Sequence, residues 1–110
     1  MSVNKVILLG NVGGDPELRY PSKDFAVAYF SLATNEMRGG VKVTEWHNIV
    51  MTGRAAEYAE RYIRRGTKLY LEGSLRTREY TDRFKIVRKR TEIFVDNFEI
   101  LGRCDTSSPS

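Results

Sequence analysis

Apolar and polar residues alternate along most of this chain with the period of two that is typical of β-strands, and one segment departs from that period. The strand-like segments are 3–12, 26–34, 43–51, 67–80 and 90–101. In 54–65 the apolar residues fall at helical spacing, and Gly66 follows as a natural stop. The order of three strands, one short helix and two strands excludes a helical bundle and a parallel sheet built on crossover helices.

The last strand contains an irregularity that the pattern itself predicts. Thr91, Ile93 and Val95 alternate on one face, and the phase then changes at Asp96 and Asn97. A change of phase within a strand indicates a β-bulge at that point.

The net charge of +4 on these 110 residues is not evenly distributed. Residues 76–90 hold seven basic and two acidic side chains, whereas the rest of the chain holds 11 basic and 12 acidic ones. The basic excess is therefore confined to one segment, which we expect to form a long β-hairpin. A solvated surface loop would carry such a run of charge, but aromatic and β-branched residues interrupt this one. Cations for phosphates and rings for base faces suit a single-stranded nucleic acid.

Among small all-β architectures, the oligonucleotide-binding barrel places its single helix between the third and fourth strands. We therefore expect an all-β, five-stranded Greek-key barrel over residues 1–102, with the long hairpin between its fourth and fifth strands. Residues 103–110 contain no core-forming side chains and are expected to be a flexible tail without an acidic tip. Fold alone does not give function, because such barrels also carry saccharide, RNA and nuclease sites.

Several motifs of the chain resemble bacterial-type single-stranded-DNA-binding proteins, in family order and spacing over about residues 3–101. They are NKVILLGNVG at 4–13, DPELRY at 15–20, FSLAT at 30–34, TEWH at 44–47, YLEG at 70–73 and LRTR at 75–78. Each motif alone is weak, and together they form a strong signal. The resemblance implies a homotetramer of oligonucleotide-binding barrels that coats single-stranded DNA without strong sequence preference, during replication, repair and recombination.

Trp46 and Tyr80 are the principal candidates for base stacking, since both match stacking positions of the family. Periodicity leaves Trp46 evenly divided between stacking and core packing, and the resemblance favours stacking. Phe84 is either a packing residue at the hairpin tip or a further base contact. Tyr29 is a weaker candidate, because cross-strand pairing explains it as well.

The chain departs from the family at two stacking positions. Thr52 precedes Gly53 where an aromatic residue is common, and Met37 and Arg38 stand where other members have Trp. Arg38 can replace the ring in part by packing on a base. The affinity per nucleotide can therefore differ from that of other members.

The remaining candidates fall into two sets. The expected phosphate contacts are Arg76, Arg78, Arg83, Lys85, Arg88, Arg90, Arg38 and Lys42. The expected oligomer contacts are His47, Tyr70, Glu72 and Lys5, and plain strand surface explains Tyr70 and Glu72 equally well. Without an acidic tip, binding of protein partners through the tail is not expected.

The composition argues against several other classes of protein. Cys104 is the single cysteine, so no internal disulfide is expected and a reducing compartment fits. The family resemblance implies that this compartment is the bacterial cytoplasm, at the nucleoid. One histidine and no clustered carboxylates predict no metal, no cofactor and no enzyme activity. No apolar run approaches a membrane span. Two alternatives stay open: an RNA-binding or primosome accessory barrel, and a metal-dependent nuclease.

Overall fold

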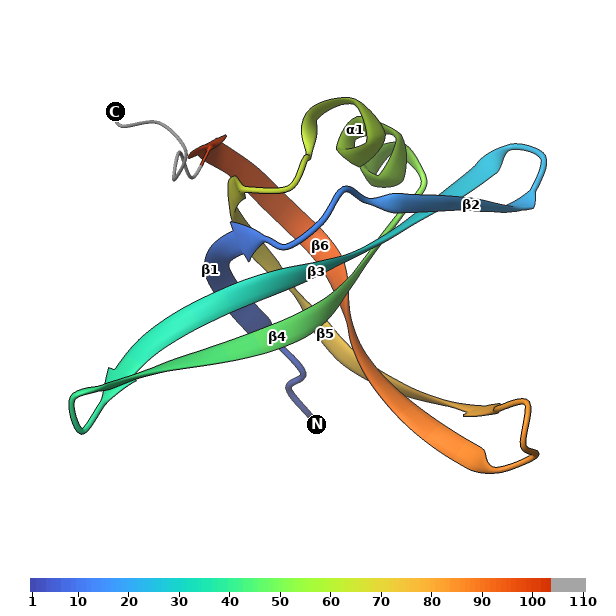
Figure 1. Cartoon of the computed structure of the whole chain (residues 1–110). Coiled ribbons are helices and arrows are strands. Elements are labelled where there is room, and N and C mark those ends of the chain that lie inside the picture. The colour runs from blue at the N-terminus through green and yellow to red at the C-terminus, as the bar shows by residue number, and fades with distance from the viewer. Residues whose placement is uncertain (104–110) are drawn as a thin grey trace.

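The computed structural model of the chain describes residues 1–103 and contains six strands and one helix (Figure 1). The elements are β1 (Val6–Val12), β2 (Glu17–Ser22), β3 (Phe25–Arg38), β4 (Val41–Thr52), α1 (Arg54–Tyr62), β5 (Thr67–Thr81) and β6 (Val87–Arg103). The tail was predicted to begin at residue 103, which is the last residue of β6. The rest of the predicted tail, 104–110, lies outside the described residues. Within residues 1–103, no helix has the length and apolar character needed to cross a membrane.

Five of the strands are joined in a ring of pairings. β1 pairs with β5, β5 with β6, β6 with β4, β4 with β3, and β3 returns to β1 at Asn11 and Val12. Every pairing is antiparallel except that of β4 with β6. The expected all-β class, with one short helix between the third and fourth of these strands, is confirmed.

β2 is a sixth strand that the sequence analysis missed. It pairs only with β3, through Glu17–Tyr29, Leu18–Ala28 and Arg19–Val27. Only Leu18 packs against the core, so β2 lacks the apolar alternation that marks the other strands.

The core lies inside the ring and is closed on one side by α1. Ala28, Phe30 and Leu32 of β3 point into it, and Leu69 and Leu71 of β5 are fully buried. The helix contributes Ala56 and Ala59, followed by Ile63, all with no exposed surface.

The helix is shorter than predicted. It ends at Tyr62, and Ile63 is extended (φ −98°, ψ 127°) so that its side chain reaches the core. Arg64 therefore lies beyond the helix, yet its guanidinium donates to the carbonyl oxygens of Glu60 (2.5 Å) and Ile63 (2.8 Å). Tyr58 and Tyr62, which share the predicted apolar helix spacing, are 45% and 55% exposed and pack against each other at 4.5 Å between ring centroids.

Two long hairpins extend beyond the core in different directions (Figure 1). The β3–β4 hairpin turns through Gly39 and Gly40, both with positive φ (56° and 82°), where the sequence predicted a wider loop. The β5–β6 hairpin was predicted, and its strands pair without interruption from Gly73–Val95 to Thr81–Val87.

The predicted bulge in the last strand is confirmed. Glu72 pairs with Asn97 and Gly73 pairs with Val95, so Asp96 has no partner in the ladder. The backbone of Phe94 lies so close to Gly73 that a Cβ there would overlap with its carbonyl. A second irregularity, at Leu101, was not predicted.

Candidate nucleic-acid interface

Trp46 and Tyr80, 34 positions apart in the sequence, line one pocket of about 340 Å³ between β4 and the β5–β6 hairpin. The pocket is completed by His47, Asn48, Leu75, Lys89, Arg90, Thr91 and Ile93. Trp46 is 62% exposed and Tyr80 is 42% exposed, so both rings are available at the surface. This exposure excludes core packing for Trp46, one of the two interpretations that periodicity left open. We call this the Trp46–Tyr80 pocket.

The indole of Trp46 is supported by Gly13, the residue that follows β1. A Cβ on Gly13 would overlap with a ring carbon of Trp46 and would lie 2.8 Å from Oγ of Ser31. The absence of a side chain at Gly13 therefore lets the indole lie against the backbone, and this restricts its freedom while most of its surface stays exposed. A ring that is already ordered loses less conformational entropy when it binds a base.

Asn48 ties β4 to the base of the hairpin arm. Its Nδ2 donates to the carbonyl of Thr91 (3.2 Å), and its Oδ1 accepts from Nη2 of Arg90 (3.3 Å). These bonds link the two walls of the Trp46–Tyr80 pocket and place the Arg90 guanidinium beside it.

A buried carboxylate orients two of the predicted phosphate contacts. Glu92 is 2% exposed, and its oxygens accept from Nε of Arg78 (3.0 Å) and lie 3.2 Å from Nε of Arg90. Arg78 and Arg90 are direct cross-strand partners, so the anion between them offsets their mutual repulsion. Hydrogen bonding to Glu92 raises the pKa of Arg78 above its ordinary value.

The loop at the hairpin tip is organised by one aspartate. Oδ1 of Asp82 accepts from the backbone N–H groups of Phe84 (2.8 Å) and Ile86 (3.0 Å), and Oδ2 accepts from Nε of Arg88 (3.0 Å). These bonds, the one from Ile86 foremost, lower the pKa of Asp82. The lone positive φ among the described non-glycine residues, 62° at Lys85, lies in this loop.

Other predicted contacts on the hairpin are packed on rings. The guanidinium of Arg76 lies 4.3 Å from the ring centroid of Phe94, and that of Arg83 lies 5.2 Å from the ring of Phe84. Phe84 itself is 69% exposed, so it is not a buried packing residue of the tip.

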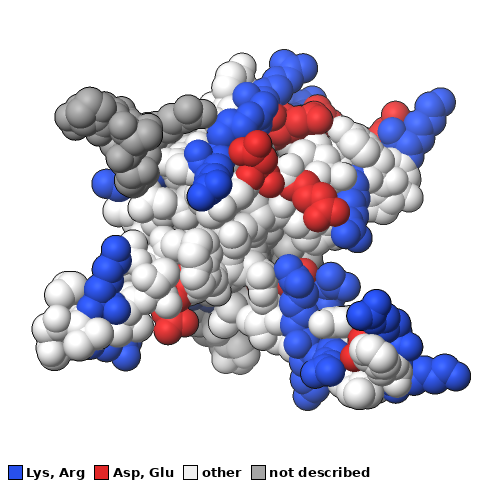
Figure 2. Space-filling view, in the orientation of Figure 1, with Lys and Arg blue, Asp and Glu red and all other residues white. Residues whose placement is uncertain are grey.

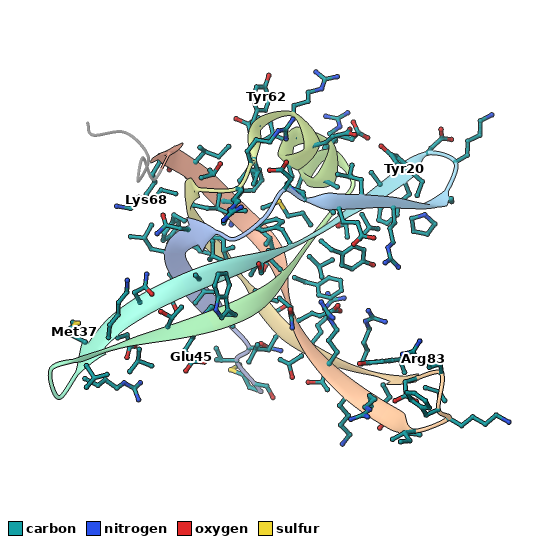
Figure 3. All side chains as sticks on the ribbon, viewed as in Figure 1. Tyr20, Met37, Glu45, Tyr62, Lys68 and Arg83 are labelled. Carbon is teal, nitrogen blue, oxygen red and sulfur yellow. The ribbon has the colours of Figure 1, made fainter. Side chains whose placement is uncertain are left out.

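The predicted phosphate contacts do not form one continuous patch. The basic side chains of 76–90 cover the lower right arm in Figure 2, which is the β5–β6 hairpin. Arg38 and Lys42 lie at the end of the β3–β4 hairpin, where Arg38 is paired with Glu36 at 2.8 Å. Met37 and Arg83, labelled in Figure 3, mark these two arms on opposite sides of the molecule. The Trp46–Tyr80 pocket involves β4 of one arm and both strands, β5 and β6, of the other.

Tyr29 lies in a second, smaller pocket of about 150 Å³. The other residues of this pocket are Glu17, Arg19, Arg78 and Arg90. The Arg19 guanidinium is 5.5 Å from the Tyr29 ring centroid and forms an ion pair of 3.0 Å with Glu17.

Arg19 was not among the site residues predicted from the sequence, and Lys89 was predicted only as a member of the basic segment 76–90. Arg19 lies on β2, and without that strand nothing in the sequence connects it to Tyr29.

Three of the four predicted oligomer contacts meet on the outer face of β1 and β5. Glu72 accepts from the hydroxyl of Tyr70 (2.5 Å) and pairs with Lys5 (3.3 Å). The hydrogen bond from Tyr70 foremost, and then Lys5, lower the pKa of Glu72, and the bond to Glu72 raises the pKa of Tyr70. His47 lies elsewhere, on β4, where its Nε2 is 2.9 Å from the hydroxyl of Thr34.

Among residues 1–103, no three side chains of His, Cys, Asp or Glu gather closely enough to hold a metal ion. Nothing in the described residues therefore builds the carboxylate cluster that a metal-dependent nuclease requires.

A small barrel with exposed rings and a basic hairpin beside its strands belongs to the class of nucleic-acid-binding barrels. The chain is a member of the Single-strand binding protein family, whose profile matches residues 3–101. It is 52% identical over 109 residues to a single-stranded DNA-binding protein of Bacteroides thetaiotaomicron, a match that covers 93% of this chain and 68% of that protein. It is also similar to a solved structure, a Plasmodium falciparum SSB in complex with single-stranded DNA, with a TM-score of 0.85 and 32% identity over 92% of this chain and 96% of that one.

Proposed function

We propose that the chain binds single-stranded DNA without regard to base sequence, and that it coats and protects this DNA during replication, repair and recombination. The observation that carries the proposal is the Trp46–Tyr80 pocket, in which two exposed rings lie beside Lys89 and Arg90. Membership of the family, together with the names of the two similar proteins, supports the same conclusion.

The binding mechanism divides between rings and cations. Trp46 and Tyr80 stack on base faces, each contributing about 1–3 kcal/mol, and they read no base edge. Phe84, exposed at the tip, and Tyr29 extend the stacking surface. The phosphate contacts are the basic residues of the two hairpins, namely Arg76, Arg78, Arg83, Lys85, Arg88, Arg90, Arg38 and Lys42. Neutralising phosphates releases counterions, so affinity falls as salt rises.

A comparison of ligands tests this function. Fluorescence anisotropy with labelled oligo-dT, a duplex of the same length and oligo-U would rank the three targets. The proposal expects tight binding to oligo-dT and much weaker binding to duplex, because paired bases cannot stack on the rings. Equal affinity for duplex would refute single-strand binding, and preference for oligo-U would favour an RNA-binding barrel. Loss of the labelled strand on addition of Mg²⁺ would refute the expectation that the chain is not an enzyme.

We also propose that the chain self-associates, as a homotetramer, through the outer face of β1 and β5. Ile7 and Leu9 pair with Glu72 and Tyr70 and are 57% and 50% exposed. Two exposed aliphatic side chains beside an ordered polar group form the kind of surface that a second copy covers. Lys5, Tyr70 and Glu72 would supply polar contacts there, and His47 a contact elsewhere. Several barrels in one particle would hold successive parts of a long strand.

We expect the protein to act in the bacterial cytoplasm, at the nucleoid.

A further inference from the structure

We infer that the molecule has a second site for the same strand, which takes an internal phosphodiester and the base next to it. This site, called the arginine pocket below, consists of Arg19, Arg78, Arg90 and Tyr29. The inference rests on the proposed function, because it extends the path of the DNA beyond the Trp46–Tyr80 pocket.

The arginine pocket is built by segments that are distant in the sequence. Arg19 comes from β2, Tyr29 from β3, and the other two arginines from β5 and β6. Together with Glu17 they enclose about 150 Å³, with one guanidinium 5.5 Å from the Tyr29 ring centroid. A concave site with cations around an aromatic ring suits a nucleotide unit, since the phosphate meets the cations and the base meets the ring.

The charges of the pocket leave a positive excess. Glu92 forms ion pairs with both Arg78 and Arg90, and Glu17 forms one with Arg19, so three guanidiniums are paired with two carboxylates. A guanidinium has five N–H donors, and these ion pairs use only some of them. The arginine side chains are 44–66% exposed, whereas that of Glu92 is 2% exposed. The unused donors are therefore accessible to a phosphate, whereas Glu92 is not, and Glu17, which is 63% exposed, is the carboxylate that competes for Arg19.

The arginine pocket adjoins the Trp46–Tyr80 pocket, because Arg90 lines both pockets. On the β3–β4 ladder Trp46 pairs with Ala33 and Val50 pairs with Tyr29, so the two rings lie on one face of the sheet. Four residues along a strand span about 13 Å, which is the spacing along β3 between Tyr29 and Ala33, the partner of Trp46. A strand that leaves Trp46 and passes Arg90 meets Tyr29 and then Arg19.

The test uses oligo-dT of about 4 and about 16 nucleotides, the limits of what one barrel occupies. Binding is followed by Trp46 emission over a range of salt concentrations, for the wild type, Arg19→Ala and Glu17→Gln. Lys23→Ala is the matched control, since it removes one positive charge from the turn between β2 and β3, outside the pocket. All three positions are exposed, so the fold is not at risk.

With the longer oligonucleotide, Arg19→Ala should reduce the slope of log K against log salt by about 0.7, the value of one phosphate on a single strand. Glu17→Gln should strengthen binding, because it releases Arg19. Both variants should change binding of the longer oligonucleotide more than that of the shorter one, and Lys23→Ala should change neither. The effect should be the same with a 5′-hydroxyl and a 5′-phosphate.

Three results would overturn the inference while leaving the proposed function intact. They are an unchanged slope in Arg19→Ala, an equal change in Lys23→Ala, and an effect restricted to oligonucleotides with a terminal phosphate. If the wild type bound neither oligonucleotide, the proposed function would fail, and the inference with it.

Discussion

At the scale of single residues, the ring of Trp46 depends on the residue beneath it. Replacing Gly13 by Ala puts a methyl group where the indole lies, so the ring must move, whereas a Cβ on Gly14 meets nothing within 4 Å. We expect Gly13→Ala to alter Trp46 emission and to weaken oligo-dT binding by a part of the about 1–3 kcal/mol that one stacked base contributes. Gly14→Ala is the control. Equal emission and affinity in the two variants would show that Gly13 does not position the indole.

Glu92 is the residue that holds the side chains of Arg78 and Arg90 in place on the hairpin. Glu92→Gln leaves Arg78 and Arg90 opposite each other without an anion between them. Charged hydrogen bonds contribute about 1.5–3 kcal/mol each, and the partial exposure of both arginines reduces that here. We expect the free energy of unfolding in urea to fall by about 1–3 kcal/mol.

The comparison for Glu92 is Glu79→Gln, an exposed position on the same hairpin. It should change the free energy of unfolding little. A loss as large in Glu79→Gln as in Glu92→Gln would mean that general charge, rather than the buried ion pairs, stabilises the arm.

At the scale of elements, the tip of the β5–β6 hairpin should respond to pH through Asp82. Its pKa is lower in the folded chain than in the unfolded one, so the ionised carboxylate stabilises the loop above the unfolded pKa of about 3.9. That stabilisation is lost as the pH falls through the folded pKa. We expect hydrogen exchange at the amides of Phe84 and Ile86 to become faster below pH about 4 than its intrinsic rate explains.

In Asp82→Asn the acid-dependent change in exchange should disappear, because no carboxyl group titrates there. Retention of the same acid dependence in this variant would assign it to another group.

Strand segments that face the core were predictable from their alternation, and the β5–β6 hairpin from its charge and rings, whereas β2 and the outer half of the β3–β4 hairpin were not. Ala28, Phe30 and Leu32 alternate because one side of β3 is buried, and that burial selects the residues. β2 and the outer half of the β3–β4 hairpin bury almost nothing, so no alternation marks them. The short helix was found from its spacing, but its end was misplaced since Ile63 reaches the core as extended chain.

Of the candidate site, the hairpin that carries it was predictable from the sequence, whereas the contacts between its side chains were not. The basic run at 76–90 and the interleaved rings identified the hairpin, because charge density is a local property of the sequence. Which side chains meet is not local. The contact of Arg19 with Tyr29 requires β2 to pair with β3, and the order of Arg78 and Arg90 requires Glu92 two positions beyond the run.

At the scale of the whole molecule, self-association through β1 and β5 should be separable from DNA binding. Replacing both Ile7 and Leu9 by Lys puts two charges on the outer face without touching the core, since both side chains are at least half exposed. We expect light scattering to show a smaller particle, while the affinity for a short oligo-dT is retained. The control is Met37→Lys, at a position that is 68% exposed on the β3–β4 hairpin, and it should leave the mass of the particle unchanged. An unchanged mass for the double variant would rule out this face as the interface.

The central claim is that an exposed ring and nearby cations bind a single strand together, and the only tryptophan of the chain reports on it directly. Titration of Trp46 emission with poly-dT should show saturable quenching that weakens as salt rises. Trp46→Ala, followed by anisotropy, should lose about 1–3 kcal/mol of binding with the salt slope unchanged, whereas Arg76→Ala with Arg78→Ala should lower that slope. Unchanged Trp46 emission on protein that anisotropy shows to be saturated with DNA would contradict the account.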